Sequence, residues 1–498
     1  MRQPVRHNAK RMRSVPSTLR PWLIILPLGA ALLGAAIAAP EMAIRLAPVL
    51  MLIPAALLFY EYPLAFAVLM LAVYGLGVDF ELVRLSASTV RDGTEAAAAS
   101  GANEGIAALG AVVLKVMPFT LAAMLMLRYG FAPAVNWPFL AFTAIAAMSL
   151  VVLPMGRVGD YPDMVRSFVG STAPFVLAFA AAPRRLWSLL CKGVIMVPLV
   201  SAVVGVLYSL VGPHYVLDPL NQRFQGMHNA PFLAGFCVTA VFASTLEYLR
   251  GFRPVWLALG AANLLVLLAT QARAPTAAVA LFLLLVFIAA RGQVFPLRRK
   301  ADLLMGGMLP GLMVLVPAFL FAMDRFIGVD GEFNYSGRDV IWPYFLDAIQ
   351  NRPLFGYGLG AGKLIVDPED PLIKLLRSNA AHNEYLRLAV DGGIIGCAAI
   401  FLGIIAWVWA GTHRLPRADR IVLRCALVAA LMHAAFDNVL IASTGVLQFI
   451  WFTATMARGR LEARSAAPAA ARRGWRSWAG RDAAAAVPSH GAGRRRVA

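Results

Sequence analysis

Five side chains of this sequence have the types and positions that chemistry on a phosphorylated lipid requires. They fall at the outer ends of predicted membrane spans or in outer loops: Arg223, His228, Arg273, Arg338 and His382. Lysine and arginine normally gather on the cytoplasmic side of a membrane protein, so arginines on the opposite side are candidates for function. Guanidinium binds phosphate through paired hydrogen bonds, and histidine is the usual base near neutral pH. Together they suggest an outward-facing site in which a hydroxyl group attacks a pyrophosphate-linked lipid donor.

The composition requires a membrane to position these residues. The chain has 498 residues, of which 60% are hydrophobic and 14% charged, and its mean hydropathy is +0.71. Soluble proteins are about 25% charged, so an ordinary cytosolic enzyme is excluded. The net charge is +19, but six basic residues without an acid lie in 1–20, and ten arginines with two acids lie in 457–498. The basic ends therefore indicate cytoplasmic tails, and we expect no nucleic-acid partner.

The apolar segments predict an all-α polytopic membrane protein with about 12–14 transmembrane helices. The candidate spans are 22–39, 43–60, 62–78, 106–127, 134–153, 168–182, 186–211, 229–249, 254–271, 275–290, 302–322, 385–410, 421–436 and 439–456. The segments 168–182 and 421–436 are short enough to be re-entrant, which is why the expected number is a range.

The Lys/Arg bias of the loops predicts an inside-out order along the chain. We expect a basic cytoplasmic N-terminal tail (1–20), transmembrane helices (21–322), one long outer loop (323–384), further transmembrane helices (385–456) and a disordered basic cytoplasmic tail (457–498). The long loop keeps aromatic residues and Gly/Pro turns, so we expect it to be ordered. A second outer loop (79–105) is polar and expected to be partly helical.

Metal and nucleotide chemistry find little support in the sequence. Cys191, Cys237, Cys397 and Cys425 lie inside apolar runs without a CxxC spacing, so they are expected to be small buried hydrophobic residues. The glycine-rich run 356–362 follows no strand and is expected to be a turn rather than a nucleotide loop. We expect no metal site and no cofactor.

Four stretches resemble the O-antigen ligase/polymerase family. Residues 336–342 (SGRDVIW) and 351–360 (NRPLFGYGLG) resemble its GR…W…PlfGyGlG segment, and residues 382–396, which begin HNEYL, resemble its HN-x-x-L…G…G segment. Residues 223–229 (RFQGMHN) resemble its R-x-x-G…HPN segment without the proline, and residues 270–273 (TQAR) resemble its T-x-S-R segment with Ala272 in place of serine. The resemblance covers about 210–450.

This resemblance implies a GT-C-like, metal-independent, inverting glycosyltransferase. Such an enzyme takes a glycan from undecaprenyl diphosphate at the periplasmic face of the bacterial inner (cytoplasmic) membrane. Carried over to this chain, Arg273 and Arg338 would bind the pyrophosphate and His382 would activate the acceptor hydroxyl. Arg223 is expected beside these arginines, and His228 as a supporting residue of the same cavity.

Four further residues are candidates for supporting roles. Asn383 or Glu384 is expected to orient the His382 ring, and spacing alone does not choose between them. Trp342 lies next to Arg338 in sequence and is expected to take part in the site. Asp437 follows His433 near an outer span end, either as a core polar pair or as part of the site.

Several functions remain open. The first is an O-antigen ligase that joins the glycan to a sugar hydroxyl of lipid A–core. Its rivals are a Wzy-like polymerase of O-antigen or exopolysaccharide, which extends a growing glycan on its carrier, and a protein O-oligosaccharyltransferase. An anion or solute transporter is more remote, because no internal repeat is apparent and the polar residues gather at one face. The expected partners are the undecaprenyl-diphosphate-linked donor, lipid A–core or a growing glycan as acceptor, and membrane lipids.

Overall fold

The protein is described by a computed structural model covering residues 58–77, 96–132, 135–155, 158–159, 161–211, 215–218, 222–307, 337–367, 370–376 and 380–466. The expected spans 22–39 and 43–60, most of the loop 79–105, and the two tails lie wholly or mostly outside these ranges. The described part is helical, and its extended pairings are two isolated bridges, Phe131 with Ala180 and Leu217 with Phe224. The all-α expectation is confirmed for this part of the chain.

The helices follow one another along the chain with short connections. They are α3 (Pro63–Leu76), α5 (Ala96–Tyr129), α6 (Trp137–Val152), η2 (Leu153–Met155), α7 (Tyr161–Thr172), η3 (Val176–Phe179), α8 (Arg184–Val211), α9 (Ala230–Gly251), α10 (Pro254–Ala269), α11 (Arg273–Ala289), α13 (Arg338–Asn351), η4 (Ala361–Lys363), α14 (Pro371–Leu376), α15 (Glu384–Thr412), α16 (Arg417–Ala434) and α17 (Ser443–Ala466).

Three described helices, α8, α9 and α15, are long and apolar enough to cross a bilayer. Four shorter apolar helices, α3, α6, α10 and α11, occupy segments expected to be spans. The total of 12–14 spans stays a prediction, because much of the N-terminal region and residues 308–336 lie outside the described ranges.

Residues 168–182 do not form the single short span expected from the sequence. Helix α7 ends at Thr172, a turn follows, and η3 occupies only Val176–Phe179. Pro174 lies in that turn, and a proline both lacks the N–H group and clashes with the preceding helical turn. The segment is therefore a broken, re-entrant type of structure rather than a continuous helix.

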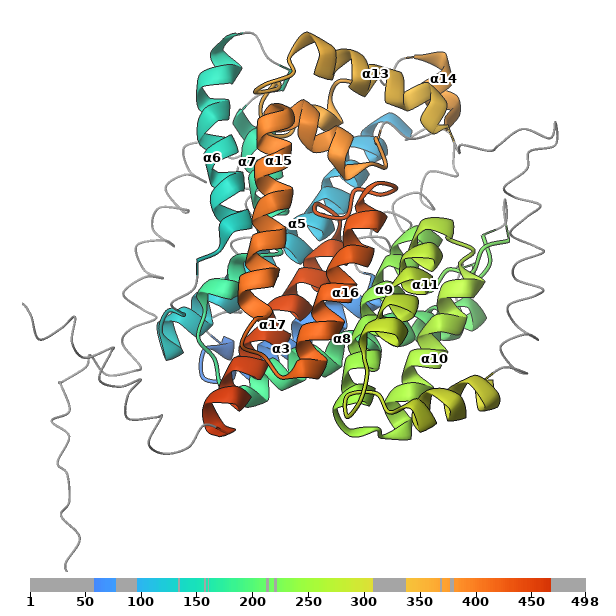
Figure 1. Cartoon of the computed structure of the whole chain (residues 1–498). Helices are drawn as coiled ribbons and strands as arrows, with labels where there is room; N and C mark the ends of the chain where they lie inside the picture. Colours follow the sequence, from blue (N-terminus) through green and yellow to red (C-terminus); the bar gives the residue numbers. More distant parts are fainter. Residues whose placement is uncertain are drawn as a thin grey trace, which may run out of the picture.

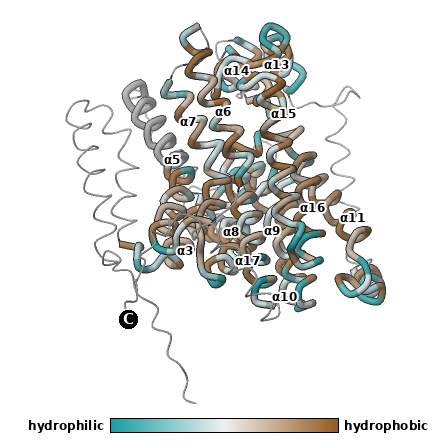
Figure 2. Tube along the Cα trace, turned by 60° about the vertical axis from the view of Figure 1, so that its left-hand side comes forward, coloured by the Kyte–Doolittle hydropathy of each residue, from teal (hydrophilic) through white to brown (hydrophobic). Residues whose placement is uncertain are grey.

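Helix α9 lies at the centre of one half of the bundle (Figure 1). It packs against α8, α10, α11, α16 and α17, and 89% of its most apolar window is buried. On the other side of α15 lie α6 and α7, and α13 and α14 cover one end of the bundle (Figure 1). Figure 2 shows a mainly hydrophobic helical body, with hydrophilic segments gathered around α13 and at the opposite end near α10.

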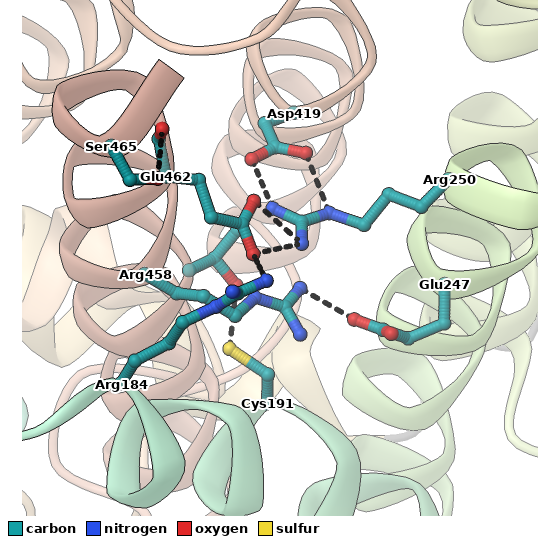
Figure 3. Close-up of polar contacts among 9 residues, drawn as sticks. Arg184, Cys191, Glu247, Arg250, Asp419, Arg458, Glu462 and Ser465 are labelled. Carbon is teal, nitrogen blue, oxygen red and sulfur yellow. Dashed lines mark hydrogen bonds and ion pairs between the residues drawn. The ribbon is translucent and has the colours of Figure 1, made fainter. Parts of the chain in front are cut away.

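A cluster of ion pairs joins four helices at the end of the bundle opposite α13 (Figure 3). Arg250 of α9 donates through Nε to Oδ1 of Asp419 on α16 at 2.8 Å and also pairs with Glu462 of α17. Arg184 of α8 donates to the same Glu462 at 2.8 Å. We call this the opposite-end cluster; it also includes Arg458 of α17 paired with Glu247 of α9.

The opposite-end cluster corrects the expected start of the C-terminal tail. Residues from 457 onward were expected to be disordered, but α17 continues to Ala466. The physical reason is that Arg458 and Glu462 are held by partners on α8 and α9, which orders two more helical turns. Residues 467–498 lie outside the described ranges.

The second half of the long outer loop is ordered within its described residues. It forms α13, η4 and α14 around a small hydrophobic cluster that includes Ile341, Phe345, Val366 and Ile373. This cluster also contains Ala381 and Val390, which lie on either side of the start of α15. The loop is therefore packed onto the end of the helix that the HN segment opens.

Candidate active site

Three segments meet at the α13 end of the bundle. Nη2 of Arg338, the first residue of α13, donates to the carbonyl of Phe436 at 3.0 Å. Nε1 of Trp342, one helical turn later, donates to the carbonyl of Ala381 at 2.8 Å. The start of α13 therefore ties the loop before α15 to the loop between α16 and α17.

His382 lies in the space between these contacts and faces a carboxylate. Its Nδ1 is 3.6 Å from Oδ1 of Asp437, just beyond hydrogen-bond range, and the two side chains are 43% and 30% exposed. Oδ2 of the same Asp437 lies 3.9 Å from Nε2 of His433, which is buried. His382 also has a φ of +46°, a conformation that costs free energy for a residue other than glycine. The bond from Trp342 to Ala381 holds the peptide directly before this strained residue.

The charge of Asp437 is favoured by its neighbours. Burial raises the pKa of its carboxyl group, but the interactions with His382 and His433 and the backbone N–H of Asn438 lower it further, so the net pKa lies below the ordinary value. An ionised Asp437 favours the His382 tautomer with a proton on Nδ1. That tautomer leaves Nε2 able to accept a proton.

Asp437, rather than either neighbour of His382, is the carboxylate beside its ring. Oδ1 of Asn383 accepts hydrogen bonds from the backbone N–H groups of Tyr385 and Leu386, so this side chain is the N-cap of α15. Glu384 is fully buried and forms an ion pair with Arg387. The two residues thus fix the start of α15, and with it the position of the preceding His382.

Arg223 and Arg273 are brought together by the turn between α10 and α11. Nε of Arg223 donates to the carbonyl of Thr270 at 2.8 Å, and the N–H of Phe224 donates to Ala269 at 3.1 Å. Arg273 is the first residue of α11, two residues after this turn. The segments 223–229 and 270–273, found separately in the sequence, therefore form one structural unit.

The replacement of serine by Ala272 changes the cap of α11. Ala272 is the N-cap residue and supplies no side-chain hydrogen bond, although Oγ1 of Thr270 accepts from its N–H at 3.4 Å. An N-cap serine would accept a hydrogen bond from the first turn of the helix. The charge of Arg273 at the positive end of the helix is unaffected by this replacement.

His228 lies in the protein core. Its side chain is 0% exposed, its Nδ1 is 2.9 Å from Oγ of Ser201, and its ring packs edge-on against Phe236. The next residue, Asn229, caps α9 by accepting from the N–H of Phe232. In the structure His228 thus joins α8 to the start of α9.

The two arginine groups lie at the same end of the bundle. Arg250 at the end of α9 pairs with Asp419 near the start of α16, so these two helices run antiparallel. The end of α16, which leads to Asp437, therefore lies beside the start of α9 and the Arg223 loop. Because Arg223 contacts the turn before α11, Arg273 is at this end as well, and α11 packs along α16 (Figure 1).

The glycine-rich run forms a turn that fits into a break in α15. Gly393 has non-helical torsions (φ 67°, ψ −178°), which frees backbone groups of the helix around it. The N–H groups of Tyr357 and Gly358 donate to the carbonyls of Val390 and Asp391 at 2.9 and 3.0 Å, and the N–H of Ile394 donates to Pro353 at 2.8 Å. The run thus pairs with the Asp-Gly-Gly segment of α15 through backbone hydrogen bonds.

Comparison with known protein families identifies the central region of the chain. Residues 256–401 match the family model described as O-antigen ligase. The chain carries a domain of the O-antigen ligase family. The match includes Arg273, Arg338 and His382, whereas Arg223 and Asp437 lie outside its bounds. A search of curated proteins found no match.

One charged group of the O-antigen ligase domain was not assigned a role from the sequence. Arg387, which is 2% exposed, pairs with Glu384 and with Asp391, whose Oδ1 also accepts from the N–H of Gly362 at 2.7 Å. This triad links the start of α15 to the glycine-rich turn. The spacing of the three residues by three and four positions in an apolar helix is the signal that could have indicated it.

Proposed function

We propose that this membrane protein is an O-antigen ligase that transfers a glycan from undecaprenyl diphosphate to a sugar hydroxyl of lipid A–core at the periplasmic face of the inner membrane. The family match supports a membrane glycosyltransferase-like enzyme acting on lipid-linked glycans. The observation that carries the finer assignment is the pair of His382 and Asp437 beside Arg338.

In this proposal His382 is the general base. The acceptor hydroxyl gives its proton to Nε2 of His382 while its oxygen bonds to the anomeric carbon of the donor. The bond from that carbon to the phosphate oxygen breaks, and its electron pair stays on undecaprenyl diphosphate. Attack from the face opposite the leaving group inverts the anomeric configuration. Asp437 stabilises the imidazolium that forms, since its carboxylate faces Nδ1.

Arginines stabilise the departing diphosphate in the same proposal. Arg338 lies beside the base, and Arg273 and Arg223 lie together at the turn before α11. A diphosphate leaves as an anion and needs positive charge rather than a proton donor. Guanidinium groups supply that charge without a metal ion or cofactor, so the proposed reaction is metal-independent.

A Wzy-like polymerase is the second candidate. It would use the same donor, arginines and base, and differs only in taking a lipid-carried glycan as acceptor. The family match is equally compatible with it. The transporter alternative is less favoured, since it gives no role to the contact between His382 and Asp437.

Deletion of the gene in its bacterial host, followed by gel analysis of lipopolysaccharide, tests the proposal. A ligase predicts core without O-chain, together with accumulation of the lipid-linked polymer. Core that carries a single repeat unit would contradict ligation and indicate a polymerase of O-antigen. Unchanged lipopolysaccharide with loss of another surface polysaccharide would contradict both O-antigen functions.

A further inference from the structure

A cavity of about 350 Å³ lies beside the proposed base, on the side away from Arg223 and Arg273. Its wall includes Ala380, two residues before His382, and Asn438, which directly follows Asp437. The cavity therefore opens next to both members of the proposed catalytic pair. None of the roles described above accounts for it.

Two cations face this cavity from different elements. Arg166 comes from α7, and Lys363 comes from η4 in the glycine-rich turn; Asp163 of α7 is the one acidic residue in its wall. Arg387 also reaches the cavity, but its charge is balanced by the buried carboxylates of Glu384 and Asp391. Arg166 is exposed, so it lies at the mouth of the cavity.

The charge on Lys363 is disfavoured in this environment. Burial lowers the pKa of its ammonium group to about 8, and the charges of Arg387 and Arg166 act in the same direction. Lys115 of α5 adds a further cation behind the wall, because its ammonium group packs against Gly170 beside Ile441. An anion bound here would relieve the repulsion among these groups.

Asn438 supplies a second kind of binding group. Among the residues that the structure describes, its side-chain oxygen is buried without a hydrogen-bond partner. A buried acceptor of this kind costs free energy unless a donor reaches it. A sugar hydroxyl in the cavity would be such a donor, and it would lie next to Asp437.

We propose that this cavity binds an acidic sugar of the glycan acceptor, with its phosphate or carboxylate between Arg166 and Lys363 and a hydroxyl group on Asn438. This inference rests on the proposed glycosyltransferase function. In an inverting displacement the acceptor must approach opposite the leaving group. Figure 1 and Figure 2 both show α7 and α11 on opposite sides of α15 and α16, so the base lies between this cavity and the arginines assigned to the diphosphate.

The test uses the full-length protein in nanodiscs and the double variant Arg166→Gln/Lys363→Gln. With saturating donor, we expect the KM for lipid A–core to rise roughly 10–100-fold, because charge-assisted hydrogen bonds are lost, while kcat changes less than about twofold. With enzymatically dephosphorylated lipid A–core that carries no acidic sugar, variant and wild type should have the same KM. Arg352→Gln, which removes a cation over the Tyr357 ring in the same loop, is the matched control and should leave the KM unchanged.

Three outcomes would overturn the inference: an unchanged acceptor KM in the double variant, an equal rise in the control, or a rise in the donor KM instead, which would assign the cavity to the donor. A binding measurement separates this inference from the proposed function. Wild-type protein should bind glucose 6-phosphate more tightly than glucose, and the double variant should lose this preference. Equal preference in both proteins contradicts the cavity assignment, whereas absence of transfer by wild type to every acceptor contradicts the function.

A lipid headgroup has the same anionic chemistry as an acceptor phosphate. Nanodiscs of phosphatidylcholine and of phosphatidylglycerol distinguish the two sources. Equal binding of glucose 6-phosphate in both membranes supports an acceptor site. Loss of binding in phosphatidylglycerol alone would make the cavity a headgroup site and overturn the inference.

Discussion

At the scale of single residues, the candidate site depends on how His382 is held. Asp437 faces its ring, the bond from Trp342 to Ala381 fixes the peptide before it, and Arg338 fixes the backbone next to Asp437. None of these groups lies in the HN segment that contains His382. The base is therefore oriented by tertiary contacts and not by its neighbours in sequence.

Asp437→Asn tests this orientation. The change keeps the size of the side chain but removes the charge that stabilises the imidazolium, so we expect kcat for glycan transfer to fall roughly 100-fold. The donor KM should stay within about twofold of wild type. Steady-state kinetics with Asp347→Asn, an exposed residue of α13, provides the matched control. Wild-type kcat in Asp437→Asn would show that the carboxylate has no role in the base.

Lys363 gives the proposed acceptor cavity a pH dependence. Its pKa is lowered to about 8, so the side chain is charged below that pH and neutral above it. Arg387 and Arg166 disfavour the charge, while Asp391 and Asp163 favour it. Binding of glucose 6-phosphate should therefore weaken as the pH rises through about 8. The second ionisation of a phosphate monoester, near pH 6, is complete before this range. Titration calorimetry across this range should give a flatter profile for Lys363→Gln; the same profile in both proteins would exclude Lys363.

At the scale of elements, the break in α15 positions both halves of the site. The glycine-rich turn enters the break, so Lys363 of the turn and Arg387 of the helix come to face one cavity. The turn can approach this closely because a side chain at Gly393 would place its Cβ 2.0 Å from the carbonyl oxygen of Leu354. The glycines of the Asp-Gly-Gly segment thus serve close backbone packing.

Gly393→Ala tests the importance of this packing. The variant combines a positive φ with a backbone clash, so we expect a loss of more than about 3 kcal/mol of stability. Gly292→Ala is the control, because Gly292 has a similar φ of 62° with no atom within 4 Å of its added Cβ. It should lose only about 1 kcal/mol. Thermal unfolding of both purified variants checks the difference, and equal losses would mean that the clash is relieved without cost.

Sequence patterns predicted helix positions better than contacts between helices. The expected span 385–410 is α15 from Glu384, and 275–290 is α11 from Arg273, because apolar length and polar ends are local signals. The early break of α7 and the late end of α17 were not predicted. The latter depends on ion pairs between Glu462 and residues on α8 and α9, which are distant in sequence.

The candidate site shows the same limit. Arg338 and His382 were found from local motifs, and the structure brings their segments together. The choice of Asp437 over Asn383 and Glu384 needed the contact between two loops. Such a contact arises only after α13, α15 and α16 have packed, so spacing in the sequence does not reveal it.

At the scale of the whole molecule, polar chemistry is divided between two ends of an apolar bundle. The candidate site occupies the α13 end, and the opposite-end cluster joins α8, α9, α16 and α17 at the other (Figure 1, Figure 3). Positive charge at that other end agrees with the predicted cytoplasmic orientation. The cluster therefore has a structural role that should be separable from activity.

Arg250→Ala tests that separation. Asp419 is 0% exposed, so removal of Arg250 leaves a buried carboxylate without its main partner. We expect a loss of about 3–5 kcal/mol of stability, seen as a lower unfolding temperature, while the folded fraction keeps the wild-type acceptor KM. The exposed Arg253 at the start of α10 provides the control, since Arg253→Ala should change stability by less than about 0.5 kcal/mol. A changed KM in Arg250→Ala would contradict the separation of the two ends.

The most direct test of the central claim is single-turnover transfer of glycan from undecaprenyl diphosphate to lipid A–core by purified protein in nanodiscs. With His382→Ala we predict a rate constant roughly 1000-fold below wild type, with donor binding unchanged, since a general base contributes about 10²–10⁴-fold. His413→Ala, an exposed histidine at the other end of α15, should transfer at the wild-type rate. A wild-type rate in His382→Ala would contradict the assignment of His382 as the base.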